Sequence, residues 1–290
     1  MKSKRFHVLT TATVLTAASL TLVMCRAPET TGSSTKSLDN FAKAGSGQSE
    51  TINSCGIDYD GKQTLPPQVQ GVLDRIHVDA SYESSRRAVI GALVAVPKSL
   101  AAPFFLSGGT IEVRPDAGTI CHQTPFSAAE RQIADTAADV PACWQQPQAG
   151  KAPHIFVTPD PAVIRHSMVR LFGYFYTEYF VARILAPAAP APFNAVSWKT
   201  AAQGFNTTRG QLADAFLSDL QTKNHDAYTR LAKFRSSDAT HFDNYVFAEA
   251  LDSYYCSKDT RSKFQSMFQK AWNVFTDQKV KSSPVSEFGI

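Results

Sequence analysis

Four residues have types and spacing that bear on metal chemistry: His166, Ser167, Arg170 and Glu249. His166 and Arg170 are four residues apart, which places both side chains on one face of a helix. A helix with two histidines at that spacing and a glutamate beside the first can hold zinc and supply a general base. Here Arg170 stands at the second ligand position, where its permanent charge prevents metal binding. Ser167 stands at the base position, and its hydroxyl cannot hold a proton from zinc-bound water at neutral pH.

The elements that must position these side chains are a strand and two helices. A short apolar run predicts a strand at residues 154–158. Asp160 is a helix N-cap and Pro161 a first-turn proline, so a helix is expected to follow at once. Apolar and aromatic residues continue along it, and we expect it to be the central buried helix of the domain. Glu249 falls in a later helix, predicted over residues 244–256.

The other predicted elements complete an α+β fold that is mainly helical with a small β-sheet. Helices are expected after Pro66-Pro67, continuing through Ile76, and at residues 84–96 and 128–138. Residues 110–114 alternate as a strand does, and we expect an edge strand able to bind an extended peptide. Prolines from Pro187 onward predict a surface loop of about twenty residues. The pattern from Thr208 to Gln211 is a capping box that would open the next helix, and Asp259 or Thr260 would cap the last one.

Two segments carry a family resemblance. Residues 165–173 surround His166, and residues 246–275 include the run Phe-Ala-Glu-Ala that contains Glu249. These segments resemble the glutamate-type zincins, in particular the protease domain of anthrax lethal factor and its relatives, over about residues 105–275. The resemblance implies a zincin-like fold whose central helix carries a degenerate H-E-x-x-H position. It also implies that His166 matches the first zinc ligand and Glu249 the downstream carboxylate ligand.

Ser167 and Arg170 replace the general base and the second ligand of the zinc site that the resemblance implies. His166 and Glu249 are the possible metal ligands that remain, and two ligands are too few for tight zinc binding. No catalytic residue is therefore assigned, and no cofactor is expected. We hypothesise that the Arg170 guanidinium occupies the vacated site and pairs with Glu249.

Three functions follow from these observations. The first is a catalytically inactive metallopeptidase-like envelope lipoprotein that binds a peptide, protein or cell-wall partner in the former active-site cleft. The alternative is an active zinc metallopeptidase with non-standard ligands, drawn from His166, Glu249 and one of Glu178, Asp252 or His241. The third is a purely structural envelope protein.

The N-terminus has the order of parts of a bacterial export signal. Three cations open the chain, namely Lys2, Lys4 and Arg5. An apolar run to residue 24 follows, and Cys25 comes next. We expect residues 1–24 to be a signal peptide and Cys25 to be lipidated, which anchors an exported protein to a membrane of the cell envelope, on the periplasmic or outer-membrane face. Cleavage after Ala27 would instead release a soluble protein. A single membrane-spanning helix is disfavoured because the run is short and rich in threonine and alanine.

Composition divides the rest of the chain. Residues 25–50 are polar and aperiodic, which indicates a lipid anchor and flexible tether, and residues 278–290 are expected to be a disordered tail. Residues 51–277 form the predicted globular domain. The formal net charge of +4 falls to +1 when the three signal cations are removed. Since no cluster of basic residues interleaved with aromatics occurs, nucleic acid is not an expected partner.

The remaining cysteines favour two disulfides, as is usual in exported chains. Cys55, Cys121, Cys143 and Cys256 allow three pairings. We expect Cys121 to pair with Cys143, because the stretch between them can form a hairpin-like excursion. Cys55 would then join the N-terminal segment to the helix that ends at Cys256.

Overall fold

The computed structural model describes residues 55–123, 141–145, 151–189 and 193–277, all within the compact unit Ser34–Ile290. The predicted signal peptide, lipidated Cys25, tether, helix at 128–138 and C-terminal tail lie outside the described residues. No single helix in the described part of the chain has the length and apolarity to cross a membrane. One sharply bent pair, Ala80–Leu93 with Lys98–Leu106, meets the test by length and composition.

A four-stranded mixed sheet forms one layer of the domain. Its strands are β1 (Ile76–Val78), β2 (Thr110–Val113), β3 (Ala142–Gln145) and β4 (His154–Val157). The spatial order is β1-β2-β4-β3, in which β1, β2 and β4 are parallel and β3 is antiparallel to β4. Because side chains alternate along a strand, buried Ile111, Val113 and Ile155 share one face while His77 and Glu112 share the other.

Helices make up most of the remaining structure. Between β1 and β3 they are η2 (Ala80–Tyr82), α3 (Glu83–Leu93), α4 (Lys98–Leu106) and α5 (Ala117–Gln123); α2 (Pro67–Gln70) and η1 (Leu73–Arg75) precede β1. After β4 come α7 (Pro161–Phe175), a π-helix η4 (Tyr176–Val181), α8 (Ala182–Leu185), α9 (Val196–Lys223), α10 (His225–Ser237), α11 (Ala239–Tyr255), α12 (Lys258–Met267) and α13 (Gln269–Thr276). The domain is thus mainly helical α+β, as predicted.

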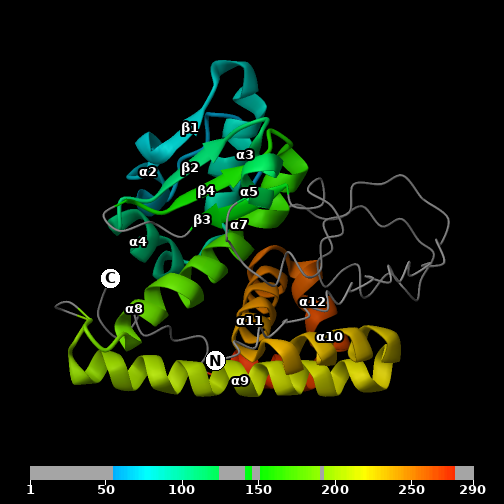
Figure 1. Cartoon of the computed structure of the whole chain (residues 1–290). Coiled ribbons are helices and arrows are strands. Elements are labelled where there is room, and N and C mark those ends of the chain that lie inside the picture. The colour runs from blue at the N-terminus through cyan, green and yellow to red at the C-terminus, as the bar shows by residue number, and fades with distance from the viewer. Residues whose placement is uncertain (1–54, 124–140, 146–150, 190–192, 278–290) are drawn as a thin grey trace, which may run out of the picture. The chain divides into compact units, whose positions relative to one another are not determined.

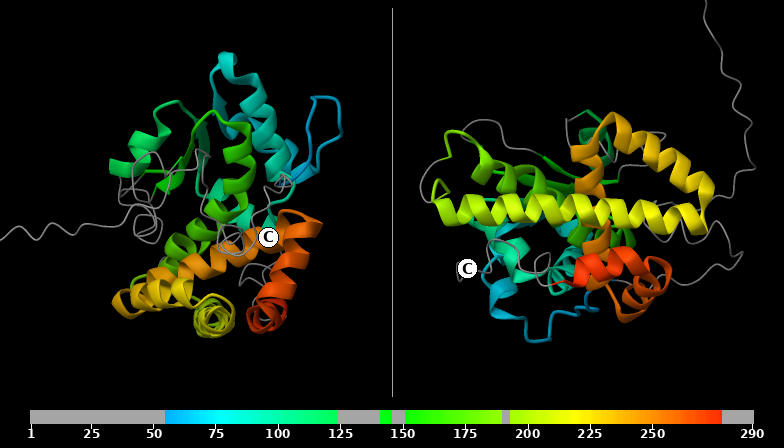
Figure 2. Two further views of the ribbon diagram at one scale, coloured as in Figure 1. Left: turned by 90° about the vertical axis from the view of Figure 1, so that its right-hand side faces the viewer. Right: turned by 90° about the horizontal axis from the view of Figure 1, so that it is seen from below.

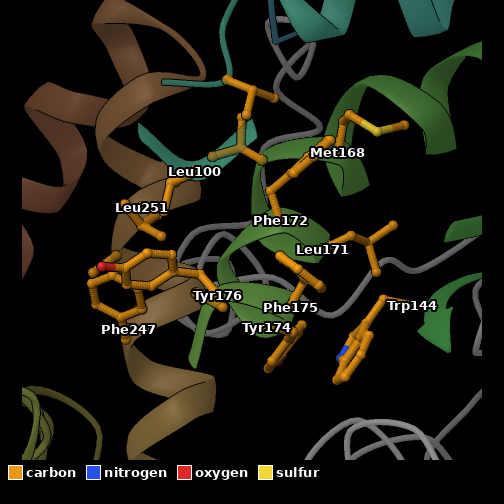
Figure 3. Close-up of a cluster of buried hydrophobic side chains, with 14 of the residues drawn as sticks. Leu100, Trp144, Met168, Leu171, Phe172, Tyr174, Phe175, Tyr176, Phe247 and Leu251 are labelled. Carbon is orange, nitrogen blue, oxygen red and sulfur yellow. The ribbon is translucent and has the colours of Figure 1, made fainter. Parts of the chain in front are cut away.

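Helix α7 is the central buried helix, which confirms the prediction. The Asp160 carboxylate caps it by accepting from the backbone N–H groups of Ala162 and Val163. Helix α7 packs against α3, α4 and β3 on the sheet side and against α11 on the other (Figure 1). Aromatic side chains fill the space around it (Figure 3), and the Phe172 and Phe175 rings each meet Phe104 edge-on with centroids 5.1 Å apart.

The longest helix, α9, runs beneath α7 and α11. Figure 2 shows it end-on in one view and along its full length in the other. Its 28 residues span about 42 Å. The ring of Phe205 on α9 contacts Tyr176 of the π-helix at 5.5 Å and Phe247 of α11 at 5.0 Å between centroids. These aromatic contacts join α9 to α11 and to the π-helix that continues α7.

Helices α7 and α11 approach each other closely at one point. This point is Gly173, where an added Cβ would lie 2.9 Å from Leu251 Cδ1 and 3.1 Å from Ala248 Cα. The second contact is with backbone and cannot be relieved by rotating a side chain. Arg170 lies just under one turn before Gly173, and Glu249 directly follows Ala248. The glycine therefore lets the two charged residues come within reach of each other.

Gly173→Ala is expected to destabilise the domain by about 1–3 kcal/mol, because the added methyl overpacks this crossing. The matched control is Gly204→Ala in α9, where an added Cβ has nothing within 4 Å. That control should stabilise by about 0.5–1 kcal/mol, since alanine is the better helix former. Urea unfolding of both variants measures the difference. Equal stability of the two variants would show that the crossing tolerates a methyl group.

Several predicted elements were wrong near the N-terminus of the domain. The helix expected to continue through Ile76 ends early, because α2 stops at Gln70 and Ile76 starts strand β1 instead. Ile76 pairs with Ile111 and buries its side chain in the sheet, which outweighs the helical spacing of the apolar residues. Strand β2 is not an edge strand, since β1 and β4 flank it. The ends of the described sheet are β1 and β3.

Two further corrections concern the C-terminal helices. The capping box at Thr208 opens no helix: α9 already begins at Val196, and the Thr208 hydroxyl donates to the Gly204 carbonyl within the helix. The loop after Pro187 is correspondingly shorter. The single last helix that was predicted is in fact two, α12 and α13, which meet at Phe268. The N-cap of α12 is Ser257, which forms a capping box with Thr260, and not Asp259 or Thr260.

The structure pairs the cysteines as Cys55–Cys256 and Cys121–Cys143, the pairs expected from the sequence. The first bond ties the start of the described residues to the C-terminal end of α11, across 201 residues of sequence. The second joins α5 to β3 on the face of the sheet opposite α7, where Ala117 and Phe156 pack around it.

Candidate functional site

Arg170 of α7 and Glu249 of α11 form a buried ion pair. The Arg170 Nη1 lies 3.2 Å from Glu249 Oε1 and donates a hydrogen bond to it. The side chains are 10% and 2% exposed, so both charges lie outside bulk water. A pair in this setting is attracted far more strongly than a surface pair, and each charge depends on the other to offset its lost hydration.

The two other residues of the candidate site lie on the same helix as Arg170. Ser167 is completely buried, and its hydroxyl has no hydrogen-bond partner among the described residues. His166 is partly buried and lies one turn before Arg170. A buried hydroxyl with no acceptor that could take its proton is not an activated nucleophile or base.

These residues do not fit a zinc ion. Glu249 Oε1 already accepts a hydrogen bond from a guanidinium, and that fixed positive charge would repel a metal cation bound to the same carboxylate. Arginine offers five N–H donors and no lone pair. Within the described ranges, the only three His, Cys, Asp or Glu residues whose ligand atoms all lie within 4.8 Å of one another are Cys55, Asp252 and Cys256. The two cysteines of that group are joined in a disulfide.

The alternative ligands interact with other residues. Asp252 places a carboxylate oxygen 3.0 Å from the Cys256 sulfur, at the end of α11. The His241 Nδ1 forms a hydrogen bond with the carboxylate of Asp238, which is the N-cap of the same helix. Glu178 accepts a hydrogen bond from the Trp144 indole, at 2.8 Å. Each of the three is engaged by a different neighbour.

Glu178 belongs to a second polar cluster that the sequence did not reveal as a unit. It lies in the π-helix and faces Trp144 of β3, while Arg209 of α9 donates to the side-chain oxygen of Asn244 on α11. Burial raises the pKa of Glu178 to about 7; the Trp144 hydrogen bond and the neighbouring His241, Asn244 and Arg209 lower it in part. A π-helix is often found at functional sites, and it was not predictable from residue spacing.

The raised pKa of Glu178 predicts a pH-dependent stability. Since the folded-state pKa of about 7 exceeds the usual value of 4.5, the proton binds the folded state more tightly than the unfolded chain. The stabilisation is complete below about pH 4.5 and is lost as the pH rises to about 7, by up to about 3 kcal/mol.

Glu178→Gln is expected to remove that part of the pH dependence, because the amide stays neutral throughout. Urea unfolding of the wild type and the variant between pH 5 and 8 measures it. Glu83→Gln is the matched control, since Glu83 is an exposed carboxylate paired with Arg87 on the surface of α3. Parallel stability curves for the wild type and Glu178→Gln would contradict the assignment.

Comparisons with known proteins give little further information. No protein-family model and no curated protein matches the sequence. A solved structure that resembles the chain is the Pro-Pro endopeptidase PPEP-2 from Paenibacillus alvei. It has a TM-score of 0.38 and 13% sequence identity, and the match covers 71% of this chain and 99% of that one. A likeness at this level establishes neither the fold family nor the activity.

Proposed function

We propose that this protein is a catalytically inactive, metallopeptidase-like protein of the bacterial cell envelope that binds a peptide or protein partner instead of cleaving it. The observation that carries the proposal is the Arg170–Glu249 ion pair. A guanidinium faces the carboxylate at the position where the family resemblance implies a zinc ion. In this proposal the guanidinium takes the place of the metal ion as the buried cation between the two helices.

The chemistry of the site supports inactivity. Hydrolysis of a peptide bond by this class of site needs a Lewis acid to polarise the carbonyl or lower the pKa of a water, and a base to take the proton. Arg170 supplies charge but no coordination position, and it is committed to Glu249. Ser167 is buried and cannot act as the base.

The envelope location and the binding role are supported by other features. The disulfides Cys55–Cys256 and Cys121–Cys143 are typical of an oxidising compartment. The predicted signal at residues 1–24 and lipidated Cys25 would place the domain on a membrane. Since β2 is flanked on both sides, an extended peptide would have to add to an end strand. We favour β3, because it packs directly against α7.

Zinc analysis of the mature protein tests inactivity. We expect wild-type protein dialysed against zinc and then buffer to retain far less than one ion per chain, with no difference in Glu249→Ala. Stoichiometric zinc that is lost in Glu249→Ala would instead support the active enzyme with non-standard ligands.

Site-specific photocrosslinking in cells tests the binding surface. A photoreactive residue at Gln145, at the end of β3, should capture a defined envelope partner. The same residue at Gln221, on the exposed face of α9, is the matched control and should not. Equal labelling at both positions would remove the assignment of β3.

A further inference from the structure

A pocket of about 610 Å³ lies at the β1–β2 side of the sheet. Neither Arg170 nor Glu249 lines it. It is lined by β1, by the segment that follows β1 up to Arg86 in α3, and by the end of β2. No lining residue belongs to α7 or α11. The carboxyl ends of parallel strands are a usual place for ligands in open sheets, and the volume is in the usual range for small-ligand sites.

The acidic side chains of the pocket already have partners. Asp79 accepts hydrogen bonds from the backbone N–H and the hydroxyl of Ser81, at 2.8 and 2.7 Å, and these bonds hold its pKa below the usual value. Glu112 lies 3.1 Å from His154 Nδ1 and 3.7 Å from Arg114. Both carboxylates that line the pocket are therefore engaged in contacts within the protein.

Of the two arginines that line the pocket, one has a partner among the described residues and the other does not. Arg114 is held by Asp116 through two parallel hydrogen bonds of 2.9 Å. Arg86, which is partly buried, makes no hydrogen bond or ion pair within the residues that the structure describes. Its neighbour Arg87 pairs with Glu83 at 3.1 Å and does not line the pocket. In the part of the chain that the structure describes, Arg86 is thus a pocket cation without a counter-charge.

Arg86 also occupies an unfavourable position on its helix for a cation. It lies near the start of α3, which begins at Glu83. A cation there is unfavourable, because the positive end of the helix dipole acts on the same space. The exposed imidazole of His77 likewise makes no hydrogen bond in the described part of the chain, and it adds a donor to the pocket.

We propose that this pocket is a binding site for an oxyanion, the phosphate or carboxylate group of a small ligand or chain end, with Arg86 as its principal binding residue. The guanidinium presents paired N–H donors that match the oxygens of either group. An anion would offset the charge of Arg86 and the positive end of α3 together. The inference is independent of the proposed peptide-binding role of β3, because the two sites share no residue.

Titration of the full mature protein at low ionic strength tests the site. The probes are inorganic phosphate and N-acetylalanine, with N-acetylalaninamide as the uncharged control. We expect the wild type to bind at least one of the two anions and not the amide, and the tighter of the two identifies the ligand group. Arg86→Gln should raise the dissociation constant at least about tenfold, whereas Arg87→Gln should leave it unchanged.

The stability of the free variants separates a binding role from a structural one. Arg86→Gln should be as stable as the wild type or slightly more so, because a cation is removed from a helix N-terminus. The proposal is overturned if neither anion binds at millimolar concentration, if Arg86→Gln binds like the wild type, or if Arg87→Gln loses as much affinity.

Discussion

Arg170→Met is expected to lower the free energy of unfolding by about 3–5 kcal/mol, because it leaves the buried Glu249 carboxylate without its guanidinium. The Glu249 side chain is 2% exposed, so water cannot replace the lost partner at small cost. The matched control is Arg165→Met on the same helix, whose partner Asp58 is 85% exposed. The Arg165 side chain is 20% exposed, but water can hydrate Asp58 once the guanidinium is gone, so this loss should be at most about 1 kcal/mol. Urea unfolding at pH 7 gives both values.

The double variant Arg170→Met/Glu249→Gln shows whether the loss comes from a stranded charge. Neither charge remains in it, so it should be at least about 2 kcal/mol more stable than the sum of the two single effects predicts. Additive losses would mean that the two residues stabilise the domain independently. The ion pair would then have no part in holding α7 and α11 together.

Removal of the Cys55–Cys256 disulfide in Cys55→Ala/Cys256→Ala is expected to destabilise the domain by about 5 kcal/mol. The bond closes a loop of 201 residues, and cross-linking so long a loop removes much entropy from the unfolded chain. It also fixes the segment in which Ile57 donates from its backbone N–H to the Gly91 carbonyl, at 3.2 Å. The comparison requires unfolding under non-reducing conditions.

Cys121→Ala/Cys143→Ala is the matched control for loop length. Its bond spans 22 residues, for which the same relation gives about 3 kcal/mol. A smaller loss for the long loop than for the short one would contradict the chain-entropy explanation. It would indicate that the N-terminal segment is held mainly by its packing.

The strand–helix unit around the candidate site was predictable because its signals are local. Asp160 and Pro161 specify the start of α7 whatever surrounds them, and the observed capping bonds are those that the sequence predicts. The meeting of Arg170 with Glu249 was a hypothesis from family resemblance. Its structural cause, the Gly173 crossing, is a tertiary contact that no residue spacing reveals.

Other elements depend on packing and could not be predicted. The prolines after Pro187 favoured a long loop, but Trp198, Ala202 and Phe205 are buried against the core and extend α9 back to Val196. Tertiary burial there outweighs weak helix formers such as Gly204. Strand β3 has only four residues and lacks a β-branched alternation, so only its pairing with β4 defines it.

The most direct test of the central claim is the zinc affinity of Arg170→His. The substitution removes the guanidinium and adds an imidazole four residues from His166, opposite Glu249, which completes three ligands of the kinds that zinc accepts. We expect Arg170→His to bind about one zinc ion per chain in equilibrium dialysis. Neither the wild type nor Arg170→His/Glu249→Ala should bind zinc. Stoichiometric zinc in the wild type, or none in Arg170→His despite native folding, would contradict the central claim.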